Sequence, residues 1–68
     1  MTVMNSAGTA MFVLKEVYVS MGNSEDGIPV FCNGDNLLAI YPTVREAGEA
    51  LHELAEAVRW GNNFFQFP

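Results

Sequence analysis

The sequence predicts an α+β fold in which one amphipathic helix packs on one face of a small antiparallel sheet of three to four strands, in the order β-β-β-α-β. Three observations predict it: an Asn-Gly turn between two apolar runs, a Thr-x-x-Glu capping box before an apolar stripe with helical spacing, and a short aromatic tail. A chain of 68 residues has room for one small core.

The N-terminal third predicts a lead-in, one strand and a loop. Residues 1–10 (MTVMNSAGTA) are small, polar and non-periodic, so we expect a flexible lead-in before a single α+β domain over residues 11–68. Residues 11–21 (MFVLKEVYVSM) are rich in β-branched and aromatic side chains, which predicts the first strand. Residues 22–27 concentrate turn formers and carboxylates, which predicts a solvent loop.

A hairpin follows. Residues 28–32 (IPVFC) and 37–41 (LLAIY) flank residues 33–36 (NGDN), in which Asn33-Gly34 is a pair typical of a type I′ turn because both central positions need a positive φ. Pro29 has no N–H to donate to a ladder, so we expect the first arm of this hairpin to begin at a sheet edge.

Thr43 and Glu46 form the capping box that opens the helix, and Gly61 after Trp60 ends it. Between them, six apolar residues fall within one stripe about 100° wide, which predicts the face that packs on the sheet: Val44, Ala47, Leu51, Leu54, Ala55 and Val58. Residues 62–68 either add an edge strand or tuck under the helix.

Composition excludes several classes of function. Eight acidic against three basic residues give a net charge of −5, which opposes binding to nucleic acid and to anionic membranes. The apolar runs are too short to span a bilayer, and the N-terminus lacks the positive region of a signal peptide, so we expect a cytoplasmic protein. Cys32 is the only thiol and His52 the only imidazole, so we expect no disulfide, no metal and no cofactor.

Catalysis is also disfavoured. Cys32 and His52 are the one candidate nucleophile and base, but we expect a buried thiol in a strand and an exposed imidazole on the helix. His52 with the neighbouring glutamates lacks the second His or Cys that a specific metal site needs. We therefore expect a protein that is not an enzyme.

The helix surface opposite the apolar stripe carries four glutamates, which we call the acidic ridge: Glu46, Glu49, Glu53 and Glu56. Their steps of about 5 Å are comparable to, though shorter than, the spacing of about 7 Å between phosphates on a DNA strand. We expect the ridge to meet a basic protein surface, assisted by the loop residues Glu25, Asp26 and Asp35. The alternative is a solvated face that keeps a small protein soluble.

Aromatic residues near the C-terminus offer a second interface: Trp60, Phe64, Phe65 and Phe67. Either the tail folds back and covers Trp60, or Trp60 and the phenylalanines form an exposed patch that anchors a partner. In a strand, Phe65 and Phe67 share one face and Phe64 shares the other with Gln66. A homodimer that pairs edge strands would bury this surplus of apolar surface.

The hairpin FCNGDNLLAIY, the capped helix TVREAGEALHELAEAVRW, the length and the acidity resemble the small proteins that bacteriophages direct against host machinery, of which anti-CRISPR proteins are the largest group. The resemblance covers about half of the chain and includes no diagnostic motif, so it transfers no residue role. It implies a non-catalytic inhibitor in a bacterial host that occupies a basic, nucleic-acid-binding surface, for example on a CRISPR effector subunit. The alternative is a small structural or assembly protein that oligomerises through the aromatic patch.

Overall fold

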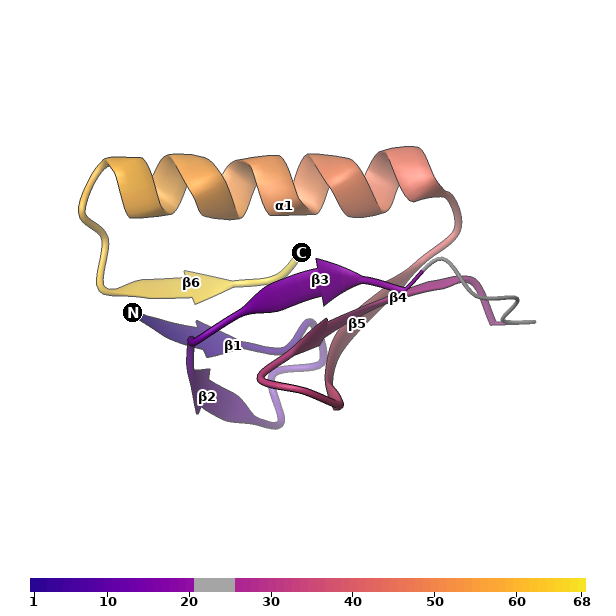
Figure 1. The fold of residues 1–68 in the computed structure, drawn as a ribbon, viewed down its shortest axis with the longest axis horizontal. Coiled ribbons are helices and arrows are strands. Elements are labelled where there is room, and N and C mark those ends of the chain that lie inside the picture. Colours follow the sequence, from indigo (N-terminus) through magenta and orange to yellow (C-terminus); the bar gives the residue numbers. More distant parts are fainter. Residues whose placement is uncertain (21–25) are drawn as a thin grey trace.

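The computed structural model describes residues 1–20 and 26–68, over which the chain folds into two three-stranded sheets and one helix (Figure 1). The α+β class is therefore confirmed, with two small sheets in place of the single sheet expected. In the first sheet β1 (Thr2–Met4) is central, antiparallel to β2 (Met11–Val13) and parallel to β6 (Phe64–Gln66). The expected end of the first strand at Met21 and the loop over residues 22–25 lie outside the described residues.

The expectation of a flexible lead-in over residues 1–10 is wrong, because β1 is the middle strand of the first sheet and Val3 is completely buried. The turn that follows is held by the Asn5 side chain, whose Oδ1 accepts hydrogen bonds from the backbone N–H groups of Thr9 and Ala10 at 2.8 and 3.1 Å. The N–H of Ser6 donates to the carbonyl of Leu38 at 2.8 Å and ties this turn to the second sheet.

The strand expected over residues 11–21 is two strands in different sheets, β2 and β3 (Val17–Val19). The chain turns between them because the Asn33 side chain binds this corner. Its Oδ1 accepts from the N–H groups of Lys15 and Glu16 at 2.8 and 3.2 Å, and its Nδ2 donates to the carbonyl of Val13 at 2.7 Å. These backbone groups pair with a side chain rather than a strand, and the ladder is interrupted there.

The second sheet contains the predicted hairpin, β4 (Ile28–Cys32) and β5 (Asn36–Tyr41), which is confirmed. Asn33 and Gly34 both have positive φ, 51° and 98°, as expected, in a connection of residues 33–35. β4 is the central strand between β3 and β5, so the expectation that it begins at a sheet edge is wrong. The position tolerates Pro29 because β3 ends at Val19, whose partner is Val30.

The helix α1 (Val44–Arg59) is confirmed, with Thr43 Oγ1 accepting from the Glu46 N–H at 3.2 Å and Gly61 at a φ of 73°. It contacts β4, β5 and β6 and thereby covers both sheets (Figure 1). Its buried face is rotated from the predicted stripe, since Ala50 and Ala57 are buried while Ala55 and the terminal Val44 and Val58 are exposed. Small alanines on this face let the helix approach the strands closely.

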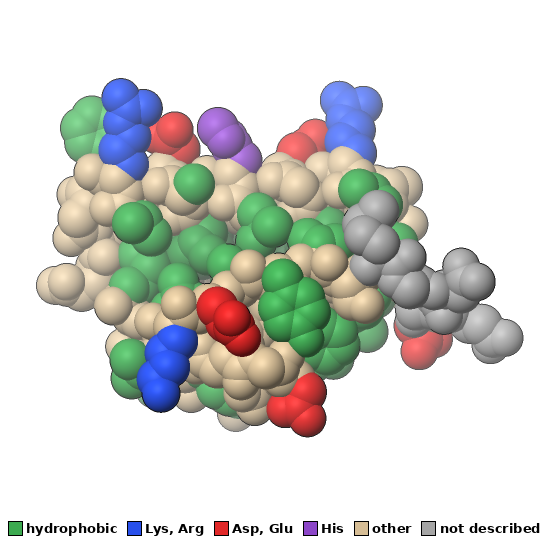
Figure 2. All heavy atoms as spheres, viewed as in Figure 1, with side chains coloured by type: hydrophobic (Ala, Val, Ile, Leu, Met, Phe, Trp, Pro, Cys, Tyr) green, Lys and Arg blue, Asp and Glu red, His purple; other side chains and the backbone are tan. Residues whose placement is uncertain are grey.

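Of the two alternatives for residues 62–68, the C-terminal tail adopts the edge strand, β6. Phe65 and Phe67 point to the same face, as predicted, and their rings meet edge to face at 5.1 Å. Phe67 is 1% exposed and joins a core of strand and helix residues. On the side of the molecule seen in Figure 2, hydrophobic side chains form a band between the helix and the strands, and charged side chains stand along the outer side of the helix.

Candidate acidic interaction surface

The acidic ridge runs along α1 with Glu46 and Glu53 directly beside the buried face and with Glu49 and Glu56 farther round the helix. At 100° per residue, Glu46 and Glu53 are the nearest neighbours of the buried Ala50 and Ala57 around the helix axis. The expectation that the ridge stands opposite the buried stripe is therefore wrong for Glu46 and Glu53, because the buried face is turned toward these two glutamates. The consequence is that these carboxylates border the junction between helix and strands.

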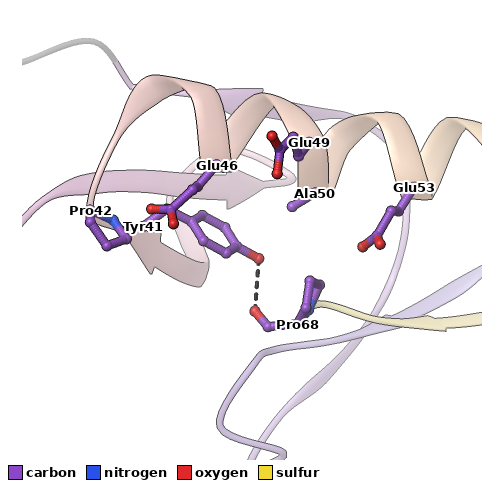
Figure 3. Close-up of a pocket in the computed structure, with 7 residues that line it drawn as sticks. All are labelled: Tyr41, Pro42, Glu46, Glu49, Ala50, Glu53 and Pro68. Carbon is purple, nitrogen blue, oxygen red and sulfur yellow. Dashed lines mark hydrogen bonds between the residues drawn. The ribbon is translucent and has the colours of Figure 1, made fainter.

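A hollow of about 310 Å³ opens at this junction (Figure 3). Glu46, Glu49 and Glu53 line it from the helix, and Tyr41 and Pro68 line it from the ends of β5 and the C-terminal tail. The Tyr41 hydroxyl donates to the carbonyl oxygen of Pro68 at 2.9 Å, which joins the two sheets beneath the helix. Figure 3 shows the Glu46 and Glu53 side chains extending from the helix toward the Tyr41 and Pro68 side.

The phenol of Tyr41, which lines this hollow, has a raised pKa. Burial raises the pKa of the phenol above its ordinary value of 10.0, and the negative charge of Glu53 raises the pKa further. At neutral pH the hydroxyl therefore keeps its proton and remains a donor to Pro68. An aromatic ring between carboxylates is an environment that suits a guanidinium group, which pairs with carboxylates and stacks on rings.

Two of the four ridge carboxylates have cationic neighbours on the helix, so more of the negative charge of the ridge is compensated than the sequence indicates. Arg45 Nε lies 3.2 Å from Glu49 Oε1, and Arg59 Nη1 lies 3.9 Å from Glu56 Oε1. His52 Nε2 lies 4.0 Å from the same Glu56 oxygen. These side chains are exposed, so each pair contributes at most about 1 kcal/mol and is easily exchanged for a partner's cation.

A second hollow, of about 460 Å³, adjoins the first along the same flank of α1, and Glu53 lines both. Trp60, Ala57 and Phe65 give this second hollow an apolar wall, and Glu56 and His52 stand on its helix side. Trp60 is 76% exposed, so the alternative in which the tail covers it is wrong. Phe65 is half-buried and Phe67 is a core residue, which leaves Trp60 and Phe64 as the exposed members of the predicted aromatic patch.

The loop carboxylates divide between the two ends of the second sheet. Asp26 precedes Gly27, whose backbone packs so closely on Tyr41 that an added Cβ would lie 2.6 Å from the Tyr41 carbonyl oxygen. Asp35 lies in the hairpin turn, at the far end of β5, which spans roughly 20 Å over its six residues. The structure thus brings Asp26 to the Tyr41 end of the sheet and Asp35 to the hairpin end, and neither lines the two hollows beside α1, while Glu25 lies outside the described residues.

Cys32 and His52 are not brought together. Cys32 is completely buried in β4, where burial raises the pKa of its thiol, and the His52 side chain is 77% exposed on the helix. Within residues 1–20 and 26–68, no group of three or more His, Cys, Asp or Glu side chains is arranged to hold a metal ion.

Sequence analysis did not predict Tyr41 and Pro68 as site residues, because their hydrogen bond joins residues 27 positions apart and leaves no local pattern.

No helix in the described part of the chain is long and apolar enough to cross a membrane. Comparison with protein-family models, curated proteins and solved structures finds no match to this chain.

Proposed function

We propose that this chain is a non-catalytic binding module that occupies a basic, nucleic-acid-binding surface on a bacterial defence complex, in the manner of anti-CRISPR inhibitors. The observation that carries the proposal is that Glu46, Glu49 and Glu53 line one open hollow with the ring of Tyr41. Lysine and arginine side chains that otherwise contact phosphates fit a surface of closely spaced carboxylates, and the tyrosine ring offers a stacking face for arginine.

The long-range field of the chain supports the same function. A net charge of −5 attracts a basic partner toward the protein, and this attraction weakens as salt screens the charges. The association rate and the affinity are therefore expected to fall as ionic strength rises.

Affinity capture from a bacterial lysate that contains CRISPR effector complexes tests the proposal. Two baits are compared, the wild type and a double variant that carries Glu49→Lys and Glu53→Lys. Glu46 is left unchanged, because it interacts with the N-cap Thr43 hydroxyl and its loss would also weaken the helix start. The wild type is expected to retain a nucleic-acid-binding protein at low salt and to release it at high salt, and the double variant is expected to lose it at both.

A matched control is the double variant Glu16→Lys and Asp35→Lys. It changes the net charge by the same amount, but both residues are exposed in connections between strands and neither lines the two hollows beside α1. The control is expected to capture as the wild type does. If the folded Glu49→Lys, Glu53→Lys variant retained the partner as well as the wild type does, the proposal would be contradicted. If both double variants lost the partner to the same extent, the binding would depend on net charge and not on the ridge.

A second candidate function is a small assembly protein anchored through Trp60, and the exposure of that indole favours it. Truncating an exposed tryptophan at the centre of an interface costs more than about 1 kcal/mol of binding. In this case Trp60→Ala would abolish a salt-resistant capture and leave the free energy of unfolding unchanged, while the ridge variant would bind normally.

A further inference from the structure

Asn33 and Gly34 are the one Asn-Gly pair in the sequence, and they lie in the turn between β4 and β5. In such a pair the backbone nitrogen of the glycine can attack the side-chain carbon Cγ of the asparagine. Nucleophile and electrophile belong to neighbouring residues, so a ring closes without a second molecule. Glycine has no Cβ beside its nitrogen, and this lack of hindrance leaves the nitrogen accessible. Deamidation of Asn33 is therefore a reaction that the turn itself can carry out.

The reaction has two steps, and water is its only co-reactant. In the first step a bond forms between Gly34 N and Asn33 Cγ, the bond between Cγ and Nδ2 breaks, and Nδ2 leaves as ammonia with the proton that Gly34 N gives up. The product is a cyclic succinimide. In the second step water opens the ring. Cleavage of the bond from the nitrogen to Cγ leaves aspartate, and cleavage of the bond from the nitrogen to the main-chain carbonyl carbon leaves isoaspartate.

The folded protein holds both polar atoms of the Asn33 side chain. The leaving group Nδ2 donates to the Val13 carbonyl at 2.7 Å, and Oδ1 accepts from the N–H groups of Lys15 and Glu16 at 2.8 and 3.2 Å. The Asn33 N–H donates to the Glu16 carbonyl at 3.0 Å, so the main chain is held as well. Departure of Nδ2 breaks its bond to Val13, and ring closure displaces Oδ1 from its two donors. The corner between β2 and β3 therefore has to open before the reaction proceeds.

We propose that Asn33 is a site of spontaneous deamidation that this corner protects in the folded protein, and that its conversion destabilises the corner. Water has access to the site, because Asn33 and Gly34 line an open hollow of about 440 Å³ with Lys15 and Glu16. A carboxylate has no proton to donate, so the oxygen that replaces Nδ2 lies against the Val13 carbonyl with both groups acting as acceptors. The new negative charge also joins that of Glu16 in the same hollow. Because ammonia is lost, the change is permanent.

Both products weaken the same contact. Aspartate keeps the main chain intact but loses the donor to Val13. Isoaspartate also inserts a carbon into the main chain, in a turn where Asn33 has a φ of 51° and Gly34 a φ of 98°. The inference does not rest on the proposed function, because neither residue of the pair lines the hollows beside α1.

Peptide mapping by mass spectrometry tests the protection, with the full chain incubated at one mildly alkaline pH in native buffer and in guanidinium chloride. In guanidinium chloride Asn33 is expected to be the fastest asparagine of the chain to gain the mass of aspartate or isoaspartate. In native buffer the rate at Asn33 is expected to fall by about tenfold or more, since its three side-chain hydrogen bonds must open first. Equal rates in the two solutions, or no reaction in guanidinium chloride, would overturn the proposal.

A matched pair of variants at Lys15 tests whether the hydrogen bonds provide the protection. Lys15→Pro removes an N–H that donates to Oδ1, and it is expected to raise the native rate at Asn33 several-fold. Lys15→Ala loses the same exposed side chain but keeps the N–H, and it is expected to react as the wild type does. A proline variant with native circular dichroism that reacts no faster than the alanine variant would contradict the proposal. If the proline variant does not fold, the wild type in the two solutions decides.

Asn33→Asp reproduces the main product and tests its consequence. The urea midpoint of this variant is expected to lie below that of the wild type, because the donor to Val13 is lost. The control Asn63→Asp adds the same charge at an exposed asparagine between α1 and β6, and it is expected to unfold at the wild-type midpoint. Equal midpoints for the two variants would overturn the claim that deamidation destabilises the corner.

Discussion

Asn33 illustrates how much of this fold depends on one side chain. It adopts a left-handed φ of 51° in the hairpin turn while its amide makes three hydrogen bonds to the corner between β2 and β3. The backbone N–H of the same residue donates to the Glu16 carbonyl at 3.0 Å. One residue thus closes the hairpin of the second sheet and fixes where the chain leaves the first.

Substitution of Asn33 separates these two contributions. Asn33→Gly keeps the left-handed backbone but removes the side-chain hydrogen bonds, so it is expected to lower the free energy of unfolding by about 1–3 kcal/mol. Asn33→Ala also strains the backbone and is expected to cost about 1 kcal/mol more. Urea denaturation measures both, and a glycine variant as stable as the wild type would show that the corner does not depend on the amide.

At the scale of elements, the rotation of α1 distinguishes this structure from the one that the apolar stripe predicts. The helix packs across strands of both sheets, so the face that fits is the one where Ala47, Ala50 and Ala57 permit close approach. The larger Val44 and Val58 lie in the first and last turns of the helix and stay exposed.

A matched pair of alanines tests this rotation. Ala50 is 2% exposed and Ala55, which the stripe placed in the core, is exposed. Ala50→Leu is expected to lower the free energy of unfolding by about 1–3 kcal/mol through overpacking, and Ala55→Leu is expected to change it by no more than about 0.5 kcal/mol. Thermal denaturation of the two variants would reveal the opposite order if the helix packed on the predicted stripe.

The contact between β5 and the tail predicts a loss of stability in alkali. The pKa of Tyr41 is raised in the folded protein, so the folded state holds the phenolic proton more tightly than the unfolded state does. The stabilisation is complete below the unfolded pKa of about 10 and is lost as pH rises through the higher folded pKa.

Chemical denaturation at a series of pH values measures this effect. Tyr41→Phe removes the hydrogen bond to Pro68 and is expected to cost about 1 kcal/mol at neutral pH. The difference in stability between wild type and variant is expected to shrink above pH of about 10. A difference that stays constant into alkali would mean that Tyr41 titrates normally.

On the scale of the whole molecule, the sequence predicted what local signals specify. The Asn33-Gly34 turn identifies the hairpin and the Thr43 cap identifies the helix start from a few neighbouring residues, and the spacing of the ridge follows from helical geometry alone. The parallel pairing of Thr2 with Phe64 joins the two ends of the chain and has no local signature, so β1 was missed. The corner at Lys15 and the hollow under Glu46 likewise depend on long-range contacts, through Asn33 and through Tyr41 with Pro68.

The charge distribution gives the molecule two kinds of surface. Carboxylates border the flank of α1 beside Tyr41 and Trp60, whereas the strands described over residues 1–20 and 26–68 carry no Asp, Glu, Lys or Arg.

The claim that the ridge replaces nucleic acid on a basic surface is tested most directly by competition. The partner captured by the wild type is loaded with fluorescently labelled nucleic acid, and each protein is titrated into the complex while anisotropy is followed. The wild type and the Glu16→Lys, Asp35→Lys control are expected to displace the nucleic acid, and the Glu49→Lys, Glu53→Lys variant is expected to leave it bound. Binding of the wild type without displacement, or equal displacement by the ridge variant, would contradict the claim.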